Sequence, residues 1–133
     1  MWPKMIQVNK TDVYMIGGNN LTEQYQDNEN FVVQRLTILI NIRTKRVELR
    51  ANMNVGRQAQ GICAINNYIY CVAGINKDIT FDSVERYNTL TDVWEILEEA
   101  KYPKKAFSMS LIPVQKRFIY SIGEASYSFS LNS

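Results

Sequence analysis

A sequence unit of about fifty residues recurs along this 133-residue chain. Its strongest copies are "VYMIGG" (13–18), "IYCVAG" (69–74) and "FIYSIGE" (118–124). Tyr14, Tyr70 and Tyr120 align in these copies, at spacings of 56 and 50 residues (70 − 14 and 120 − 70). The same register aligns a small residue at each strand end: Gly17, Ala73 and Gly123. A recurring unit of this length predicts a repeat architecture, in which each unit packs only against its neighbours.

Two further alignments give nearly the same period. "LINIRTKRVEL" (39–49) aligns with "RYNTLTDVWEI" (86–96) at an offset of 47 residues (86 − 39). "VGRQAQ" (55–60) aligns with "YPKKAF" (102–107) at the same offset (102 − 55), which places Arg57 opposite Lys104. Three independent registers therefore agree on one repeat.

Each unit contains four short segments that read as strands. In the central copy they are residues 59–65, 68–73, 82–88 and 93–97, rich in β-branched and aromatic residues and separated by turn residues. Only "WEILEEAKY" (94–102) could form a helical turn or two. The run "FVVQRLTILINI" (31–42) would place apolar residues on both faces of a strand, which is typical of a sheet covered on both faces. Four-stranded sheets that cover one another are the blades of a propeller.

These motifs resemble the kelch repeat. The match is best in the central copy, where the matching residues are Arg57, Tyr70, Gly74, Val84, Glu85, Tyr87, Trp94 and Leu97. The first copy keeps Tyr14, Gly17 and Gly18, with Ile40 and Val47 in place of the second Tyr and the Trp. The third copy keeps Tyr120 and Gly123 and has Glu124 in place of the second glycine.

The fold class we expect is therefore all-β, a kelch-like β-propeller segment of four-stranded antiparallel blades that is incomplete as a closed propeller. The repeats would span residues 1–56, 57–103 and a truncated third, 104–133. Tyr87 and Trp94 are expected to fill the wedge between neighbouring blades. The glycine pairs let the backbone turn sharply at a strand end. These motif residues are expected to be structural.

The two cysteines are expected to remain unpaired. Asn66-Asn67 is a good two-residue hairpin turn, which would place Cys63 opposite Tyr70 and Cys71 opposite Ile62. Cys63 and Cys71 would then lie on opposite faces of the hairpin and could not form a disulfide. Unpaired, buried cysteines favour a reducing compartment, so we expect a cytoplasmic protein.

Composition excludes several kinds of function. The 15 basic and 13 acidic residues give a net charge of +2, which offers no electrostatic basis for nucleic-acid binding. No apolar run approaches the ~20 residues of a membrane helix, and the first ten residues do not resemble a signal peptide. With no histidine and only two cysteines, we expect no metal site, no cofactor and no enzymatic activity.

Polar loops are the candidate functional elements. In proteins with kelch repeats the loop after the glycines and the loop entering the next blade open on one face; here these are residues 19–31, 75–82, 51–57 and 98–105. Rigid scaffolds with variable loops commonly serve protein recognition, so we expect a protein–protein interaction module. The candidate partner-binding residues are Glu23, Tyr25, Asp27, Arg57, Asn76, Lys77, Asp78 and Lys104. Residues 19–31 could equally be a disordered insertion.

Two other functions stay open. The chain could contribute purely structural blades to a larger propeller or assembly, or, less plausibly, it could be a carbohydrate-acting propeller enzyme. At a period near fifty, 133 residues supply fewer than three blades, whereas closed propellers need about four to eight. The remaining blades would come from additional chain, from a partner or from self-association.

Overall fold

The computed structural model describes residues 3–18, 33–103, 105, 107–122 and 127–130. Every regular element in this part of the chain is a β-strand. The first strands are β1 (Lys4–Gln7), β2 (Asp12–Ile16), β3 (Thr37–Asn41) and β4 (Val47–Leu49). The middle strands are β5 (Gly61–Ile65), β6 (Tyr68–Val72), β7 (Ile75–Asn76), β8 (Ile79–Thr80), β9 (Val84–Asn88) and β10 (Val93–Ile96). The last strands are β11 (Ser110–Val114), β12 (Phe118–Ile122) and β13 (Tyr127–Ser130).

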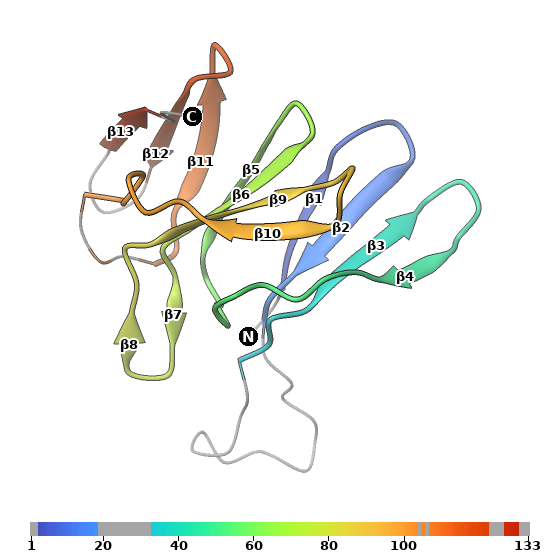
Figure 1. Cartoon of the computed structure of the whole chain (residues 1–133), viewed down its shortest axis with the longest axis horizontal. Coiled ribbons are helices and arrows are strands. Elements are labelled where there is room, and N and C mark those ends of the chain that lie inside the picture. Colours follow the sequence, from blue (N-terminus) through green and yellow to red (C-terminus); the bar gives the residue numbers. More distant parts are fainter. Residues whose placement is uncertain (1–2, 19–32, 104, 106, 123–126, 131–133) are drawn as a thin grey trace.

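The strands form three main antiparallel sheets arranged like an open fan (Figure 1). The first sheet has the order β1-β2-β3-β4, the second β10-β9-β6-β5 and the third β11-β12-β13. Strand β5 contacts both β1 and β11, so the first strands of the three sheets are neighbours. The expected all-β fold of antiparallel blades is confirmed, and the described sheets do not close into a ring.

The second sheet matches the predicted central copy. All four of its strands lie within the predicted segments, and the segment from Trp94 to Tyr102 continues as strand and turn without a helix. The loop between β6 and β9 differs from expectation, because it contains the two-stranded hairpin β7-β8. Asn66 and Asn67 form the predicted tight turn, with Ile65 paired to Tyr68 and Asn66 at φ 54°.

The cysteine prediction follows from this register and is confirmed. Cys63 pairs with Tyr70 and Cys71 pairs with Ile62, and both thiols are free and buried. Cys63 packs in the core shared with the third sheet, whereas Cys71 packs in the core shared with the first. The two side chains therefore point to opposite faces of one hairpin.

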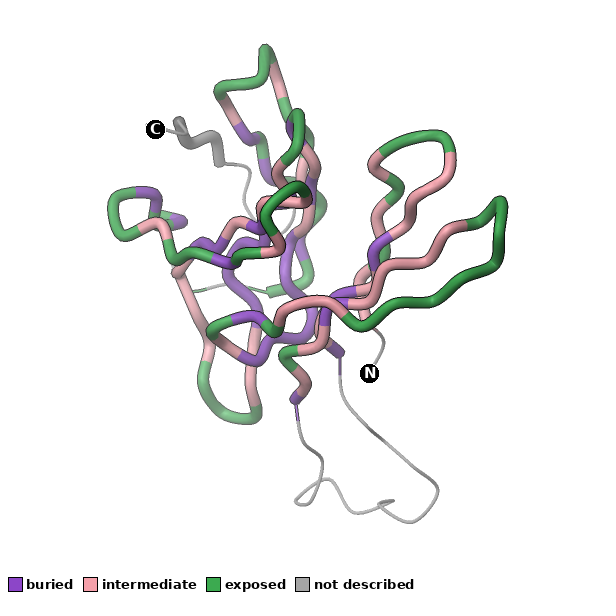
Figure 2. The backbone as a smooth tube through the Cα atoms, turned by 45° about the vertical axis from the view of Figure 1, so that its right-hand side comes forward, coloured by how far each residue is buried: buried purple, intermediate pink, exposed green. Residues whose placement is uncertain are grey.

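Two apolar cores hold the fan together, one on each face of the second sheet. Figure 2 shows that the buried segments gather in the middle of the fan, whereas the hairpin tips are exposed. Between the first and second sheets lie Tyr14, Ile16, Met53, Ile69, Cys71, Tyr87 and Trp94. Between the second and third sheets lie Cys63, Ile65, Tyr70, Val72, Ala73, Val84, Tyr102, Met109 and Ile119. The second sheet is thus covered on both faces, as the runs of apolar residues in its strands require.

The aromatic residues of the central copy fill the first interface, as predicted. Tyr87 is completely buried, and its ring meets Tyr14 edge-on at 5.6 Å between centroids and Trp94 at 5.1 Å. The arrangement suits aromatic pairs, which favour tilted and edge-to-face contacts over face-to-face stacking.

A search of the described residues for a membrane-spanning helix finds none.

Candidate functional site: a loop face fixed by a buried ion pair

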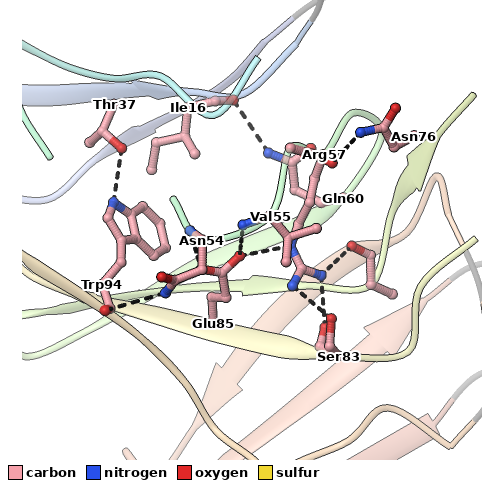
Figure 3. A network of polar contacts seen from close by, with 12 residues as sticks. Ile16, Thr37, Asn54, Val55, Arg57, Gln60, Asn76, Ser83, Glu85 and Trp94 are labelled. Carbon is pink, nitrogen blue, oxygen red and sulfur yellow. Dashed lines mark hydrogen bonds and ion pairs between the residues drawn. The ribbon is translucent and has the colours of Figure 1, made fainter. Parts of the chain in front are cut away.

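The candidate site begins with an ion pair inside the second sheet (Figure 3). Arg57 lies just before β5 and Glu85 lies in β9, and their Nε and Oε2 atoms are 3.2 Å apart. Neither side chain is exposed to solvent. Burying two charges is costly unless their remaining polar atoms are also satisfied, so the surrounding contacts decide what the pair does.

Glu85 fixes the loop that connects the first two sheets. Its Oε1 accepts a hydrogen bond of 2.8 Å from the backbone N–H of Asn54, and its Oε2 accepts one of 3.2 Å from that of Val55. Hydrogen bonds to a carboxylate are stronger than those between neutral groups. Glu85 therefore sets the path of loop 51–57.

Arg57 fixes the loop between β6 and β9. Its Nη1 donates to the carbonyl oxygens of Ala73 (2.8 Å) and Ser83 (2.9 Å), and its Nη2 donates to the Ser83 hydroxyl (2.7 Å). Ala73 and Ser83 are the two ends of this loop, and the guanidinium also lies 5.4 Å from the ring centroid of Phe81. The guanidinium thus holds the two ends of loop 74–83 together with several N–H donors at once. A lysine ammonium, a compact point charge, lacks this planar arrangement of donors.

Backbone contacts bring these two loops together. Gln58 and Ile75 exchange two backbone hydrogen bonds of 3.0 Å, and the Asn76 amide donates to the carbonyl of Gly56 at 3.3 Å. Residues 98–103 of the last predicted loop lie at the same end of the molecule, because Tyr102 N donates to the carbonyl of Asp82 at 2.8 Å. Three of the four predicted loops therefore lie side by side. We call this surface the loop face and define it as residues 51–57, 75–82 and 98–103.

The fourth predicted loop, 19–31, lies outside the described residues. The strand end before it approaches the same ion pair, because Gly18 N donates to the Arg57 carbonyl at 3.1 Å. Gly17 has φ 70°, and a Cβ there would lie only 2.4 Å from that carbonyl. Glycine is required here for both the backbone angle and the space.

The predicted binding residues occupy different environments. Lys77 and Asp78 are exposed at the tip of the β7-β8 hairpin, and Asn76 beside them is half-buried. Arg57 is completely buried, so in this structure it holds the loops and does not itself reach a partner. Glu23, Tyr25, Asp27 and Lys104 lie outside the described residues.

Sequence reasoning missed one residue of this face. Ile79 lies in β8 next to Asp78, and its side chain is 62% exposed. Ile79 thus adds an apolar side chain to the otherwise polar tip of the β7-β8 hairpin. The signal was an isolated isoleucine in a polar loop, which the strand pattern alone did not distinguish from a buried one.

Among the predicted structural residues, Tyr14, Tyr70, Gly74, Glu85, Tyr87 and Trp94 are all buried. Gly18 is also buried and Gly17 is half-buried. Tyr120 is exposed, because 46% of its surface on the third sheet is accessible to solvent. Gly123 lies outside the described residues. The exposure of Tyr120 reflects a sheet that has no described neighbour on that side.

Metal binding, thiol reactivity and a surface pocket are the remaining chemical features of the described residues. None of their His, Cys, Asp or Glu side chains form a group of three or more that could hold a metal ion. Burial raises the pKa of the Cys63 thiol to about 12 and raises that of Cys71 further still, so neither is a ready nucleophile near neutral pH. A surface pocket on the β3-β4 hairpin is lined by Leu39, Asn41, Thr44, Arg46 and Glu48, and contains no residue of the loop face.

Comparisons with known proteins agree with the central copy. Residues 56–100 match the family described as the Kelch motif. Kelch-like protein 15 from Danio rerio is 44% identical over 48 residues, and those from Gallus gallus and Homo sapiens are each 42% identical over 48 residues. Each alignment covers 36% of this chain and 8% to 10% of the relative. The chain thus spans only a small part of the length of these curated relatives.

Proposed function

We propose that this chain, whose residues 56–100 match the Kelch motif, is a protein–protein interaction module that binds a partner through the loop face. The observation that carries this proposal is the buried Arg57–Glu85 pair, which holds two loops from different parts of the sequence in one fixed arrangement. Binding to loops that are already ordered avoids the entropy cost of ordering those loops on association.

The chemistry of the exposed tip favours a protein partner. Lys77 and Asp78 offer charges of both signs, and the exposed Ile79 adds an apolar contact beside them. Protein interfaces commonly combine an apolar centre with a polar rim. We further propose that residues 19–31 extend this face, with Glu23, Tyr25 and Asp27 as contacts, and that Lys104 contributes at its edge.

The proposal includes the place and the organisation of the module. We propose that the chain acts without catalysis, metal or cofactor, in a reducing compartment such as the cytoplasm, since its two cysteines are unpaired. The repeats would divide at residues 1–56, 57–103 and 104–133. Further blades would come from additional chain, from a partner or from a second copy.

Purely structural blades are the second candidate function. The specific observation in its favour is that the first and third sheets each expose apolar residues on the face away from the second sheet. On this alternative the chain would complete a larger propeller and its loops would contact nothing.

Site-specific photo-crosslinking separates the two functions. A photoreactive residue at position 78 on the loop face is compared with one at position 90, which is exposed in the turn at the other end of the second sheet. Crosslinks to one protein from position 78 and not from 90 are expected. Equal crosslinking from both positions, or none from 78, contradicts binding through the loop face.

The affinity for that protein is then measured with matched variants. Lys77 and Lys116 are both exposed lysines in hairpin turns with positive φ, 54° and 56°, so Lys116→Glu is a close control for Lys77→Glu. Loss of a contact at the interface should weaken binding by roughly tenfold for Lys77→Glu, and Lys116→Glu should bind like the unmodified chain. Equal affinities of the two variants would overturn the assignment.

A further inference from the structure

The first sheet carries an apolar face that no described residue covers. In an antiparallel sheet, directly paired residues point to the same side. Two such rows cross the sheet on the side away from the second sheet: Met5, Met15, Ile38 and Leu49, and next to them Val13, Ile40 and Val47. Val47 is 66% exposed, Leu49 70% and Met5 57%. We call this the leading face.

The third sheet carries a second uncovered face. Ile112 pairs with Tyr120, and Ile122 lies two residues further along β12 on the same side. These three side chains are 47%, 46% and 54% exposed, respectively. The alternate residues, Ile119 and Leu111, point the other way and pack in the core with the second sheet. We call the face with Ile112, Tyr120 and Ile122 the trailing face.

The sequence repeat makes these two faces counterparts of faces that already pack within the chain. Tyr120 aligns with Tyr14, which packs against Tyr87 of the next sheet, and with Tyr70, which is buried against the third sheet. The trailing face is thus the kind of face that packs on a following sheet.

The leading face is the other half of that contact. By the repeat offsets, Val13 and Met15 align with Ile69 and Cys71 (56 residues), and Ile40 and Val47 align with Tyr87 and Trp94 (47 residues). Those four residues of the second sheet form the surface that receives Tyr14. The leading face is therefore built to receive a tyrosine-bearing face such as the trailing face.

We propose that two copies of this chain associate head to tail, with the trailing face of each copy packed on the leading face of the other. The complementarity of the two faces selects this occupant, because one chain carries both halves of the contact. In their described residues, two copies supply six main sheets, within the range of about four to eight at which propellers close. Two identical contacts related by a twofold axis leave neither face exposed.

The mass of the full chain in solution tests this proposal. Analytical ultracentrifugation should show a concentration-dependent dimer with twice the 15.4 kDa chain mass. Val47→Asp changes the leading face and Tyr120→Asp changes the trailing face, so each variant spoils both contacts of a symmetric dimer. Each should weaken dimerisation by at least about 30-fold, the effect of one interface hot spot.

A matched control and a mixing experiment sharpen the result. Leu90→Asp changes an exposed apolar residue (74%) that lies on neither face, and it should dimerise normally. When the Val47→Asp and Tyr120→Asp chains are mixed, one unmodified leading face meets one unmodified trailing face. A heterodimer of the two variants should therefore form, although each variant alone is monomeric.

Each other outcome overturns the proposal. A monomer at all concentrations shows that the faces do not meet, and open-ended polymers show that the contact does not close at two copies. A dimer that only one of the two face variants disrupts indicates pairing of like faces. Circular dichroism of each variant confirms folding, and Leu49→Asp and Ile112→Asp replace any variant that unfolds.

Discussion

The indole N–H of Trp94 in β10 donates a 2.9 Å hydrogen bond to the hydroxyl of Thr37 in β3. Both residues are buried, and the same N–H lies 3.1 Å from the carbonyl of Ala51 in the connecting loop. One aromatic side chain thus joins the outer strand of the second sheet to the first sheet and to the loop between them. Trp94, which the repeat pattern predicts to fill the space between two sheets, therefore also forms hydrogen bonds across that space.

Replacing Trp94 tests the two parts of this link separately. Trp94→Ala should lower the free energy of unfolding by about 3–5 kcal/mol, because it leaves a large cavity between two sheets. Trp94→Phe keeps most of the apolar volume and leaves the Thr37 hydroxyl without its donor, so a loss of about 1–2 kcal/mol is expected. Urea denaturation measures both. Equal losses of unfolding free energy for Trp94→Phe and Trp94→Ala would show that the apolar volume kept by phenylalanine does not contribute to stability.

Glu85→Gln should be strongly destabilising although it is nearly isosteric. The change leaves the charge of Arg57 buried without a counterion, and breaking such a pair typically costs about 3–5 kcal/mol. Glu95→Gln is the matched control, because Glu95 pairs with Arg86 at a half-exposed surface site, where a pair contributes about 0–1 kcal/mol.

Hydrogen exchange locates the effect of the Glu85 substitution. Because the carboxylate accepts from the backbone N–H groups of Asn54 and Val55, these two amides should exchange faster in Glu85→Gln than in Glu95→Gln. Unchanged protection at both amides would mean that Glu85 does not order loop 51–57.

The central copy of the repeat could be predicted because its local signals are strong. The Asn66-Asn67 turn sets the pairing of β5 with β6, and this pairing alone determines which face each cysteine occupies. Likewise, Trp94 and Tyr87 are large residues in strands with apolar residues on both faces, which leaves them no place except an interface between sheets.

Long-range polar contacts could not be predicted in the same way. Arg57 is a candidate partner-binding residue by sequence, whereas the structure buries it through contacts with Glu85, 28 residues away, and with the ends of another loop. The β7-β8 hairpin was missed because its strands have two residues each and lack an alternating pattern. Such contacts arise from tertiary structure, which local propensity does not encode.

Both cysteines should be inert in the folded protein. Burial raises the pKa of Cys63 to about 12 and that of Cys71 further, so the reactive thiolate is scarce throughout the neutral range. A thiol reagent at pH 8 should label neither residue in buffer and both in denaturant. The intact mass should not change on reduction. Fast labelling of one cysteine without denaturant would show that the hairpin opens locally.

Asp92 should make the stability of the first interface depend on pH. Its Oδ1 accepts hydrogen bonds from the backbone N–H of Ala51 (2.8 Å) and from the Tyr87 hydroxyl (2.7 Å). The hydrogen bond from Ala51 is the largest of the causes that lower the pKa of Asp92 below its ordinary value, and the bond from Tyr87 is the next. The Arg50 guanidinium, at 3.5 Å, also lowers this pKa. The folded state therefore favours the ionised carboxylate.

The sign of the effect follows from the lowered pKa. The stabilisation is fully present above the unfolded pKa, near about 4, and is lost as the pH falls through the lower folded pKa. Asp92→Asn keeps an oxygen acceptor and tolerates the φ of 58°, so it mainly removes the charge. Because the side chain is 40% exposed, solvent screening limits the expected loss at pH 7 to about 1 kcal/mol.

Denaturation of the full chain at several pH values measures this difference. The gap in unfolding free energy between the unmodified chain and Asp92→Asn should be constant from pH 6 to 8, about two or more units above the ordinary carboxyl pKa, and should shrink below about pH 4. Glu48→Gln is the control, since Glu48 also contacts Arg50 at 3.5 Å but is half-exposed, and it should change stability by less than about 0.5 kcal/mol throughout. If the difference in unfolding free energy between the unmodified chain and Asp92→Asn stays the same at low pH, the charge of Asp92 does not stabilise the interface between the first two sheets.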